Sequence, residues 1–360
     1  MKILFITAHP YLPQMHGGLQ NSTDQLCRCL RERGHKVAVL CALTPGGWFG
    51  WRARIVLQIG KRLRGRKAAK DNALGYPVWR AWFPWEAVAE VAKCEKPDVI
   101  VVMAMRQVRM ALAARPLDVP LLMQIQDAEF RQHDGDFGQL GKAACVANSR
   151  FTADKYREAF GVDPAVIHPF IDLDKYKTDT TRGNVTFINP VSEKGVEVAL
   201  ALARLYPEIP FSFVEAWPLT PDRRAALTQA LASLPNVTLM PPQDDMRKIY
   251  GGCKILLAPS VWEEAYGRVI TEAGVSGIPS LASTRGGLPE AVGPGGVLLD
   301  PTAPVENWAA ALRRLWNDRP YYDAMAAAAR AHAWRPENTL SYKIDLWERA
   351  LRHAAGTASL

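Results

Sequence analysis

The 360-residue sequence predicts an α/β protein made of two Rossmann-like domains. Apolar runs of strand length alternate with amphipathic helical stretches. The alternation stops in a polar segment and then begins again, and the length suits two domains of ordinary size. We expect an N-terminal domain at 1–170, a linker at 171–184, a C-terminal domain at 185–335 and a last helical segment at 336–360.

The first half opens with a strand, a helix and a strand, which together form a βαβ unit. The strand Met1–Ala8 precedes an amphipathic helix over Leu19–Arg33 and a second strand over Lys36–Cys41. The loop before this helix ends in Gly17-Gly18, which places main chain without side chains at the helix start. Later strands are expected over Val99–Met103, Pro120–Ile125, Ala143–Ala147 and Ala165–His168, and later helices over Arg106–Ala114 and Ser149–Phe160.

The stretch at about 48–85 departs from this rhythm and is rich in tryptophan and basic residues. Eight Lys or Arg lie between Arg52 and Lys70 with no acidic residue among them, and they supply much of the formal net charge of +8. Apolar residues recur there at helical spacing, at Ile55, Val56, Ile59 and Leu63. The pattern fits an interfacial helix that docks on an anionic membrane or a lipid-linked acceptor. It fits equally well an ordinary insertion whose tryptophans pack on the domain.

A second alternating set follows the linker. Strands are expected over Val185–Ile188, Phe211–Val214, Val237–Met240, Cys253–Ala258 and Ser280–Ala282, and helices over Val196–Leu205, Pro221–Leu234, Asp244–Gly251 and Arg268–Val275. Further helical stretches are expected at Pro304–Asn317, Tyr321–Trp334 and Asn338–His353. The last of these carries an apolar stripe at Tyr342, Leu346 and Ala350.

Composition excludes several classes of protein. No apolar run approaches the roughly 20 residues that a membrane span needs. The start MKILFITA suits a strand and no small-residue cleavage site follows it, so we expect no signal peptide and a cytosolic protein. The six cysteines are scattered without a C-x-x-C pair, which supports neither a disulfide framework nor a zinc site.

The stretch Pro259–Glu290 combines a strand end, two carboxylates and two glycine turns. Glu264 lies in a strand-to-helix loop, and Glu272 lies in the helix that follows. Open α/β sheets bind ligands at the carboxyl ends of their strands, where helix N-termini offer amide donors to anions. Because a carboxylate repels an anion, we expect these two glutamates to accept hydrogen bonds from sugar or ribose hydroxyls.

Glycines beside the two glutamates favour an anionic ligand. The amides of Gly267, Arg268 and Val269 would open the helix toward it. The later turn Gly286-Gly287 has bare main chain that a diphosphate could approach closely.

This block resembles the donor site of glycosyltransferase family 4, whose members are retaining nucleotide-sugar transferases of the GT-B fold. The resemblance rests on the Glu-x7-Glu pattern of Glu264 and Glu272, on Tyr266-Gly267, and on the Gly-Gly-x-x-Glu that ends at Glu290. It covers nearly all of the chain, but its specific motifs lie in the second half. It implies two Rossmann-like domains that face each other across a cleft, with the C-terminal helix crossing back onto the N-terminal domain.

The resemblance also implies roles for individual residues. Glu264 would be the catalytic carboxylate that holds sugar hydroxyls near the reacting carbon, and Glu272 would hold the ribose hydroxyls. Lys194 matches the family lysine that clamps the donor diphosphate. Asn189 stands where the family has an arginine, so one charge of the clamp is missing unless Arg268 or Arg285 replaces it.

On the acceptor side, the Gly17-Gly18 loop would face the donor phosphates or the acceptor. The family commonly has a histidine-aspartate pair after the strand matched by Leu121–Ile125, and this sequence has Gln126-Asp127 there. Asp127 is therefore expected on the acceptor side, and His133 could supply the missing imidazole only through a loop excursion. Asp134-Gly135-Asp136 matches a metal-binding Asp-x-Asp only formally, and we expect no metal ligands.

We therefore expect a retaining, metal-independent transfer of a sugar from a nucleotide diphosphate donor to an acceptor hydroxyl. UDP or GDP is the favoured leaving group, no cofactor is expected, and the acceptor is a glycan, a lipid-linked precursor or a small molecule. The protein is expected in the cytoplasm, with residues 48–70 as a contact for the inner face of an anionic membrane.

Three other functions stay open at this point. The first is a nucleotide-sugar epimerase of the same fold. The second is a basic protein that binds membranes or nucleic acid, although the clustering of the cations in one insertion argues against a nucleic-acid partner. The third is a family member that binds the donor without turnover, suggested by Gln126 and Asn189.

Overall fold

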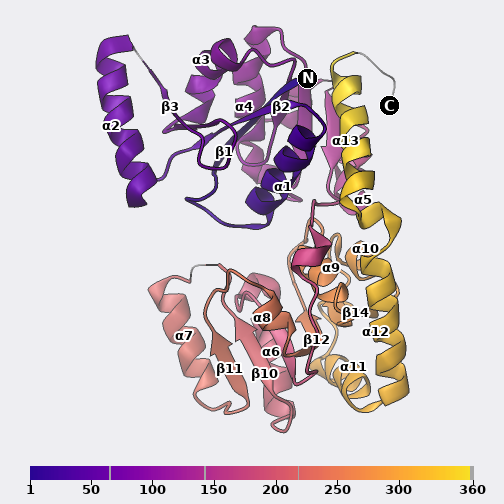
Figure 1. Ribbon diagram of the computed structural model, residues 1–360. Helices are drawn as coiled ribbons and strands as arrows, with labels where there is room; N and C mark the ends of the chain where they lie inside the picture. The colour runs from indigo at the N-terminus through magenta and orange to yellow at the C-terminus, as the bar shows by residue number, and fades with distance from the viewer. Residues whose placement is uncertain (65, 142, 218, 357–360) are drawn as a thin grey trace. The chain divides into compact units, whose positions relative to one another are not determined.

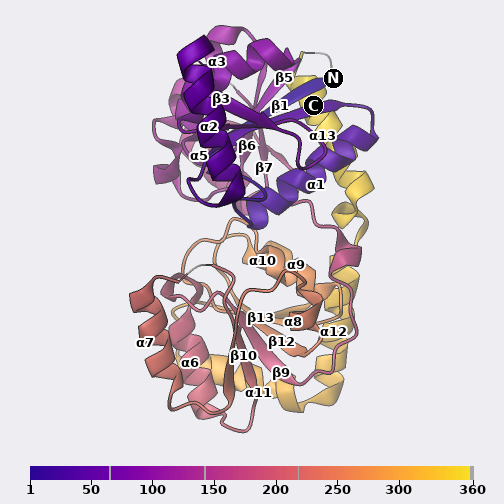
Figure 2. The same cartoon turned by 60° about the vertical axis from the view of Figure 1, so that its left-hand side comes forward.

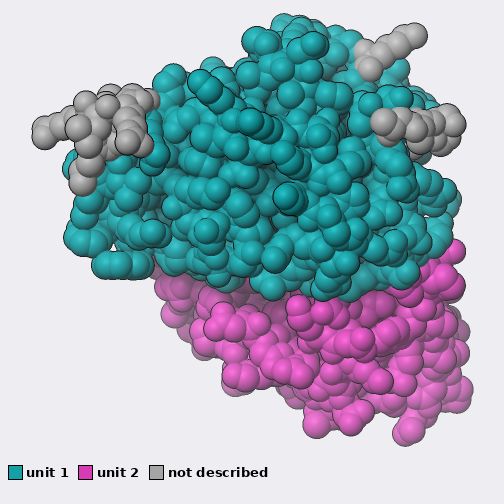
Figure 3. Space-filling model, turned by 45° about the horizontal axis from the view of Figure 1, so that its top comes forward, with its two compact units in different colours: residues 1–170, 340–360 teal, residues 171–339 magenta. Residues whose placement is uncertain are grey.

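The chain divides into two units, each built around its own β-sheet (Figure 1). Unit 1 comprises Met1–Phe170 and Leu340–Leu360, and unit 2 comprises Ile171–Thr339 (Figure 3). The structure is a computed structural model that describes residues 1–64, 66–141, 143–217 and 219–356, with the backbone alone for 59–64. The C-terminal segment belongs to the unit that the N-terminal half forms, which confirms the expected return of the last helix.

The described strands of unit 1 form a sheet in the order β3-β4-β2-β1-β5-β6-β7-β8. They are β1 (Lys2–Pro10), β2 (Lys36–Ala42), β3 (Ala68–Asp71), β4 (Val78–Ala81), β5 (Val99–Val102), β6 (Leu121–Ile125), β7 (Ala144–Ala147) and β8 (Ala165–Val166). Neighbouring strands are parallel except β3, which pairs antiparallel with β4 at the edge. Residues 3–8 of the central strand β1 are all buried, as expected for a parallel strand covered on both faces.

Helices cover both faces of this sheet. They are α1 (Gly18–Glu32), α3 (Pro84–Glu95), α4 (Gln107–Ala114), α5 (Arg150–Phe160) and α13 (Leu340–Ala354). Helices α3, α4 and α5 share one apolar core with the sheet, and α1 and α13 share the other. Figure 2 shows α1 and α13 lying side by side. Ser149 caps α5 by accepting a hydrogen bond from the Thr152 amide, as predicted.

The stretch at 48–85 contains one long helix and two short edge strands of the sheet. The helix at Gly47–Arg64 confirms the helical spacing expected there, and β3, which pairs antiparallel with β4, departs from the βα rhythm as expected. Strand β4, which joins β2 in parallel, was not predicted. Edge strands of four residues carry too short an alternating pattern to be recognised in a basic sequence. The tryptophans divide into two groups: Trp79 is buried and Trp85 packs on the core, whereas Trp48, Trp51 and Trp82 are 67%, 55% and 40% exposed.

Helix α2 (Gly47–Arg64) carries Trp48 and Trp51 in its first turns. Among the side chains of this helix that the structure describes, Ala53 and Leu57 are buried apolar residues, and they pack in a small cluster with residues of β3 and of the loop after β2. Ile55 and Val56 are half-buried, and the side chains of Ile59, Lys61, Arg62 and Leu63 lie outside the described residues.

Unit 2 has a parallel sheet in the order β11-β10-β9-β12-β13-β14 among the described residues. Its strands are β9 (Asn184–Ile188), β10 (Phe211–Val214), β11 (Val237–Met240), β12 (Cys253–Ala258), β13 (Ser280–Ser283) and β14 (Gly296–Leu299). Its helices are α6 (Val196–Leu205), α7 (Pro221–Leu231), α8 (Arg247–Tyr250), α9 (Arg268–Gly274), α10 (Leu288–Val292), α11 (Val305–Asn317) and α12 (Arg319–Ala333). Alternate residues of each strand enter two cores, one with α6, α7 and α11, the other with α8, α9 and α10.

The apolar stripe predicted for α13 is confirmed in part. Ala350 is buried and Leu346 packs on the core, whereas Tyr342 is 42% exposed, and Lys343, Ile344 and Trp347 are buried instead. Lys343 can be buried because its Nζ donates a hydrogen bond of 2.7 Å to the carbonyl of Pro169. Among the described residues, no helix is both long enough and apolar enough to cross a membrane.

Candidate functional site

The strand order of unit 2 predicts where its ligand site lies. Strand β9 is the first in the chain, β10 and β11 extend the sheet on one side, and β12 begins the other side. In such a doubly wound sheet, the loops after the two central strands diverge to opposite faces and leave a crevice at their carboxyl ends. The loops at 189–195 and 259–267 are these two loops, and they carry the lysine and the first glutamate singled out from the sequence.

The loop after β9 is shaped by one residue with a left-handed backbone. Asn189 has φ 61°, and its amide donates to the carbonyl of Val214 at 2.8 Å. Its side-chain Oδ1 accepts hydrogen bonds from the amides of Ala216 at 3.1 Å and Trp217 at 2.7 Å. Asn189 therefore ties the loop after β10 to the loop after β9.

A glycine brings the loop after β9 against the loop after β12. Residues 192–194 form a 3₁₀ turn that ends at Gly195, with φ 81°. A Cβ on Gly195 would lie 2.1 Å from the carbonyl oxygen of Pro259, which is too close for any side chain at this position. The Lys-Gly pair therefore needs its glycine so that Lys194 can reach the second loop.

Lys194 and Glu264 form an ion pair between these two loops, and Oε1 of the same carboxylate accepts a hydrogen bond of 2.8 Å from Ser260. The two side chains are 13% and 14% exposed. The Lys194 ammonium also lies 4.8 Å from the ring centroid of Trp217 and 4.6 Å from that of Trp262. One cation, one carboxylate and two indoles thus meet at the carboxyl end of the sheet.

Glu272 lies in α9 with both carboxylate oxygens engaged. Tyr250 donates to Oε2 at 3.1 Å, and Arg268 donates to Oε1 at 3.1 Å across one helical turn. Arg268 also donates to the hydroxyl of Tyr176 at 3.3 Å. Burial, followed by the nearby Glu272 charge, raises the pKa of Tyr176 to about 12.

Both arginines that could replace the missing cation have protein partners in this structure, and their role in the diphosphate clamp stays a prediction. The guanidinium of Arg268 is bound to Glu272, and Arg285 donates to the carbonyl of Val261 at 3.2 Å. Lys194 is the cation that contacts Glu264 in the described structure.

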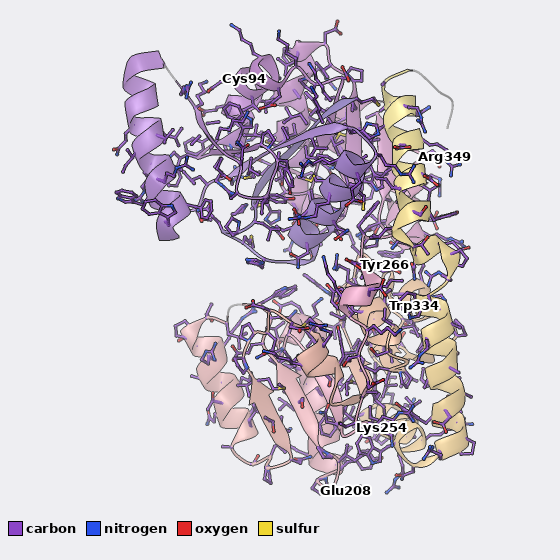
Figure 4. All side chains as sticks on the ribbon, in the orientation of Figure 1. Cys94, Glu208, Lys254, Tyr266, Trp334 and Arg349 are labelled. Carbon is purple, nitrogen blue, oxygen red and sulfur yellow. The ribbon has the colours of Figure 1, made fainter. Side chains whose placement is uncertain are left out.

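Helix α9 starts at the position predicted for it. Gly267 is its N-cap with φ 97°, and a Cβ there would lie 2.6 Å from a methyl group of Leu288. The amides of Arg268 and Val269 follow as the first residues of the helix. Tyr266, which is labelled in Figure 4, lies just before them and is buried. Its hydroxyl lies 3.1 Å from that of Thr271.

Gly286 and Gly287 pack directly under the main chain of the first glutamate. Gly286 has φ 61°, and a Cβ there would lie 2.2 Å from the carbonyl oxygen of Glu264. The Gly287 amide donates to that same carbonyl at 2.7 Å. The two glycines thus allow the Glu264 loop to pack directly against this turn. Their contact with a diphosphate stays a prediction.

In unit 1, the Gly17-Gly18 pair lies after β1 and opens helix α1, with Gly17 as the N-cap in an extended conformation. Asp127 follows β6, the strand two places away in the sheet. Burial, with a smaller contribution from the Glu129 charge, raises the pKa of Asp127 to about 6. A carboxyl group with such a pKa can exchange a proton near neutral pH.

His133 does not stand in for the missing imidazole. Its ring is buried in an aromatic cluster with Phe130, Phe137 and Tyr156, and its Nε2 hydrogen bonds to the Tyr156 hydroxyl. Burial lowers the pKa of His133 to about 4, so the ring is neutral at pH 7.

The nearby Asp-Gly-Asp sequence has structural partners. Asp134 pairs with Arg109 at 2.8 Å, and Asp136 accepts a hydrogen bond from the Gly138 amide at the start of a 3₁₀ turn. Both carboxylates therefore serve the local fold.

Sequence reasoning missed Trp217, Trp262 and Tyr250. Trp262 lies two residues before Glu264 in the strand-to-helix loop, and that position is a signal that could have identified it. Trp217 and Tyr250 come from other loops and helices, and their contacts follow from the order of the strands.

Comparisons with known proteins agree with this arrangement. Residues 16–175 match the family model described as Glycosyltransferase Family 4, and residues 175–332 match the one described as Glycosyl transferases group 1. The D-inositol 3-phosphate glycosyltransferase of Mycobacterium sp. strain KMS is 29% identical over 213 residues, which cover 52% of this chain and 47% of the relative. The protein of the same name from Segniliparus rotundus is 30% identical over 239 residues, covering 58% and 53%. The chain thus spans about half the length of the curated relatives it matches.

Solved structures share the fold over almost the whole chain. Anabaena HepE in complex with UDP and glucose has a TM-score of 0.75 at 21% identity and covers 97% of this chain and 98% of its own. A glycosyltransferase from Rickettsia africae has a TM-score of 0.74 at 16% identity and covers 99% of both chains. The fold defined by the two sheets is that of the GT-B proteins. More specifically, since both halves match family models, the chain belongs to glycosyltransferase family 4.

Proposed function

We propose that this protein transfers a sugar from a nucleoside diphosphate sugar to an acceptor hydroxyl, with retention of configuration and without a metal ion. The observation that carries this proposal is the pairing of Lys194 with Glu264 at the carboxyl ends of β9 and β12. A cation suits a departing diphosphate, and a carboxylate suits sugar hydroxyls. We propose a UDP-sugar as the donor, because a protein that shares this fold was solved with UDP and glucose.

The residues divide the chemistry between the two ends of the bond that breaks. The acceptor oxygen forms a bond to the anomeric carbon, the bond from that carbon to the diphosphate oxygen breaks, and the acceptor proton passes to the departing diphosphate. Lys194 and the amides at the start of α9 stabilise the charge that grows on the diphosphate. Glu264 orients the sugar and faces the positive charge that develops on its ring, while Glu272 binds the ribose hydroxyls.

Residues of unit 1 are proposed to serve the acceptor. Asp127 and the Gly17-Gly18 loop lie after strands of the parallel sheet, at the carboxyl ends where such sheets bind ligands. The acceptor is a hydroxyl of a glycan, a lipid-linked precursor or a small molecule. Inositol phosphate belongs among the acceptors to be tested, because the curated relatives are named for it.

Transfer assays with single substitutions test this proposal. UDP-, GDP- and ADP-sugars are offered with a panel of acceptors, and nucleotide release and the anomeric configuration of the product are measured with and without a chelator. Lys194→Ala and Glu264→Ala should each lower the transfer rate about a hundred- to a thousand-fold, because each removes a preorganised electrostatic contact. Lys254→Ala is the control, since Figure 4 shows Lys254 and Tyr266 at opposite ends of unit 2.

Other outcomes would identify the rival functions. Near-normal turnover in Lys194→Ala contradicts the site assignment. An epimerised donor in the absence of any acceptor would show an epimerase, and donor binding without turnover would show a binding protein.

We also propose that unit 1 contacts an anionic membrane through an aromatic-basic patch made of Trp48, Trp51, Arg52, Arg54, Trp82 and Phe83. All six side chains are exposed. The rings of Trp48 and Trp51 stack at 5.1 Å, and the guanidinium of Arg54 lies 5.8 Å from the ring of Trp82. Exposed indoles beside arginines match the chemistry of a membrane interface with anionic headgroups.

Vesicle sedimentation tests the aromatic-basic patch. The protein should bind vesicles that contain anionic phospholipid more strongly than neutral ones, and added salt should weaken this binding. The double variant Trp48→Ala/Trp51→Ala should lose most of it, whereas Tyr342→Ala, which removes an exposed aromatic side chain on α13, should not. Equal binding by all three proteins would contradict the proposal.

A further inference from the structure

Two tryptophans enclose the ammonium of the proposed diphosphate-binding lysine. Trp217 comes from the loop after β10 and Trp262 from the loop after β12. Their ring centroids lie 4.8 Å and 4.6 Å from the Lys194 Nζ and 5.7 Å from each other, with 68° between the ring planes. We name Trp217 and Trp262 the indole clamp. Both rings are close enough to Nζ for cation–π attraction.

The indole clamp also contains an unused hydrogen-bond donor. The Nε1 atom of Trp262 is buried and has no hydrogen-bond partner among the described residues. A buried N–H without an acceptor costs free energy, so its retention beside an ammonium points to an acceptor that is not part of the protein. An oxygen of an anionic ligand bound to Lys194 is such an acceptor.

Asn189 holds one side of the indole clamp in place. Its Oδ1 accepts the amide hydrogen bonds of Ala216 and Trp217, at 3.1 Å and 2.7 Å, and so fixes the main chain that carries the Trp217 ring. The φ of 61° at this position suits asparagine better than a bulkier residue. Asn189, which stands where the family resemblance expects an arginine, thus holds the loop that carries Trp217.

A lysine needs such support more than an arginine does. Its ammonium is a compact charge on a flexible stem, whereas a guanidinium is a planar group that binds phosphate with two donors at once. Two indole faces restrict where the ammonium of Lys194 can lie. The N–H of Trp262 adds a second donor beside the lysine.

We propose that Asn189, Trp217 and Trp262 together replace the second cation of the diphosphate clamp. In this arrangement the indole clamp holds Lys194 in its binding position, Trp262 donates a hydrogen bond to the same diphosphate, and Asn189 is a positioning residue that acts through Trp217. The inference rests on the proposed function, because it assumes that Lys194 binds the donor diphosphate.

Calorimetric titration with UDP and with UDP-glucose tests the inference. Trp217→Leu should weaken the binding of both compounds by the same factor, about five- to thirty-fold, because both share the diphosphate and each loses the cation–π support of Lys194. Trp262→Phe, which keeps a ring but removes the N–H, should also weaken both. Trp316→Leu is the matched control: Trp316 lies 4.5 Å from the ammonium of Lys254, and that residue is at the amino end of β12.

A double-mutant cycle tests whether Asn189 acts through Trp217. Asn189→Gly tolerates the same backbone angle but removes the accepting oxygen, so it should weaken binding about as much as Trp217→Leu. The double variant should lose no more than either single one, because both break the same support. Additive losses, or a loss confined to UDP-glucose, would overturn the positioning role.

Different results would contradict the indole clamp and the proposed function. If Lys194→Ala weakens UDP binding while Trp217→Leu and Asn189→Gly bind normally, the indole clamp is wrong and the proposed function stands. If the unaltered protein binds neither UDP nor UDP-glucose, and Lys194→Ala changes nothing, the proposed function itself is wrong. Thermal unfolding of each variant, followed by circular dichroism, shows that the loss is one of binding and that the fold is retained.

Discussion

Glu264→Gln should bind UDP more tightly than the unaltered protein while losing most of its transfer activity. The reason is competition for one ammonium. Glu264 is paired with Lys194 and also accepts a hydrogen bond of 2.8 Å from Ser260. A diphosphate that binds Lys194 must displace this carboxylate, and an amide of the same shape competes less strongly.

The size of the effect follows from the charges involved. A hydrogen bond to a charged group contributes about 1.5–3 kcal/mol, and a neutral one about 0.5–1.5 kcal/mol. Replacing the carboxylate by the amide therefore removes about 1 to 1.5 kcal/mol of competition, which corresponds to about five- to twelve-fold tighter binding of UDP. The same substitution removes the charge that faces the reacting sugar, and transfer should fall about a hundred- to a thousand-fold.

Calorimetry with UDP and a nucleotide-release assay measure the two effects separately. Glu193→Gln is the matched control, because Glu193 is the neighbour of Lys194 but its carboxylate pairs with Arg223 at 3.1 Å. Tighter UDP binding in both variants would mean a general charge effect. Weaker UDP binding in Glu264→Gln would refute competition for Lys194, and unchanged transfer would refute the catalytic role of the carboxylate.

Two further predictions concern the loops around the candidate site. Gly286→Ala should lower the free energy of unfolding of unit 2 by more than about 2 kcal/mol, because its Cβ would lie 2.2 Å from the Glu264 carbonyl oxygen. Chemical denaturation measures this loss. Gly34→Ala is the control and should cost only about 1 kcal/mol, because Gly34 has φ 85° but no atom within 4 Å of the added Cβ. Asp127→Asn should raise the melting temperature at pH 8 but not at pH 4. The pKa of Asp127 is raised from 3.8 to about 6, so the native state loses up to about 3 kcal/mol of stability as the pH rises through 6. A change in melting temperature of the same size at both pH values would contradict this account.

Much of the fold could be predicted because buried parallel strands have a simple sequence signature. The strands Phe211–Val214, Val237–Met240 and Cys253–Ala258 have the predicted bounds, since each is an apolar run between polar turns. Strand β14 and helix α10 were missed because they lie among glycines and prolines, which interrupt the apolar pattern. Short elements of this kind depend on the sheet that they join.

The candidate site was predicted in part for a similar reason. The positions of Glu264, Glu272 and Lys194 follow from strand ends and helix starts, which local sequence reveals. The ion pair between Arg268 and Glu272 could have been read from their spacing of four residues in a helix. The role of Asn189 could not, because it depends on a left-handed backbone angle and on a loop brought close only by the order of the strands.

The ion pairs of the candidate site link binding of the donor to release of the Glu264 carboxylate. Lys194 is matched by Glu264, and Arg268 is matched by Glu272, so neither pair leaves a surplus cation for a diphosphate. A donor that takes Lys194 must therefore release Glu264, and the released carboxylate becomes able to accept hydroxyl hydrogen bonds from the sugar on that same donor. Binding of the diphosphate and preparation of the catalytic carboxylate are then one exchange of partners. A diphosphate without a sugar would free the carboxylate with no hydroxyl to bind it, so UDP-glucose should bind more tightly than UDP by about the value of those hydrogen bonds, about 1.5–3 kcal/mol.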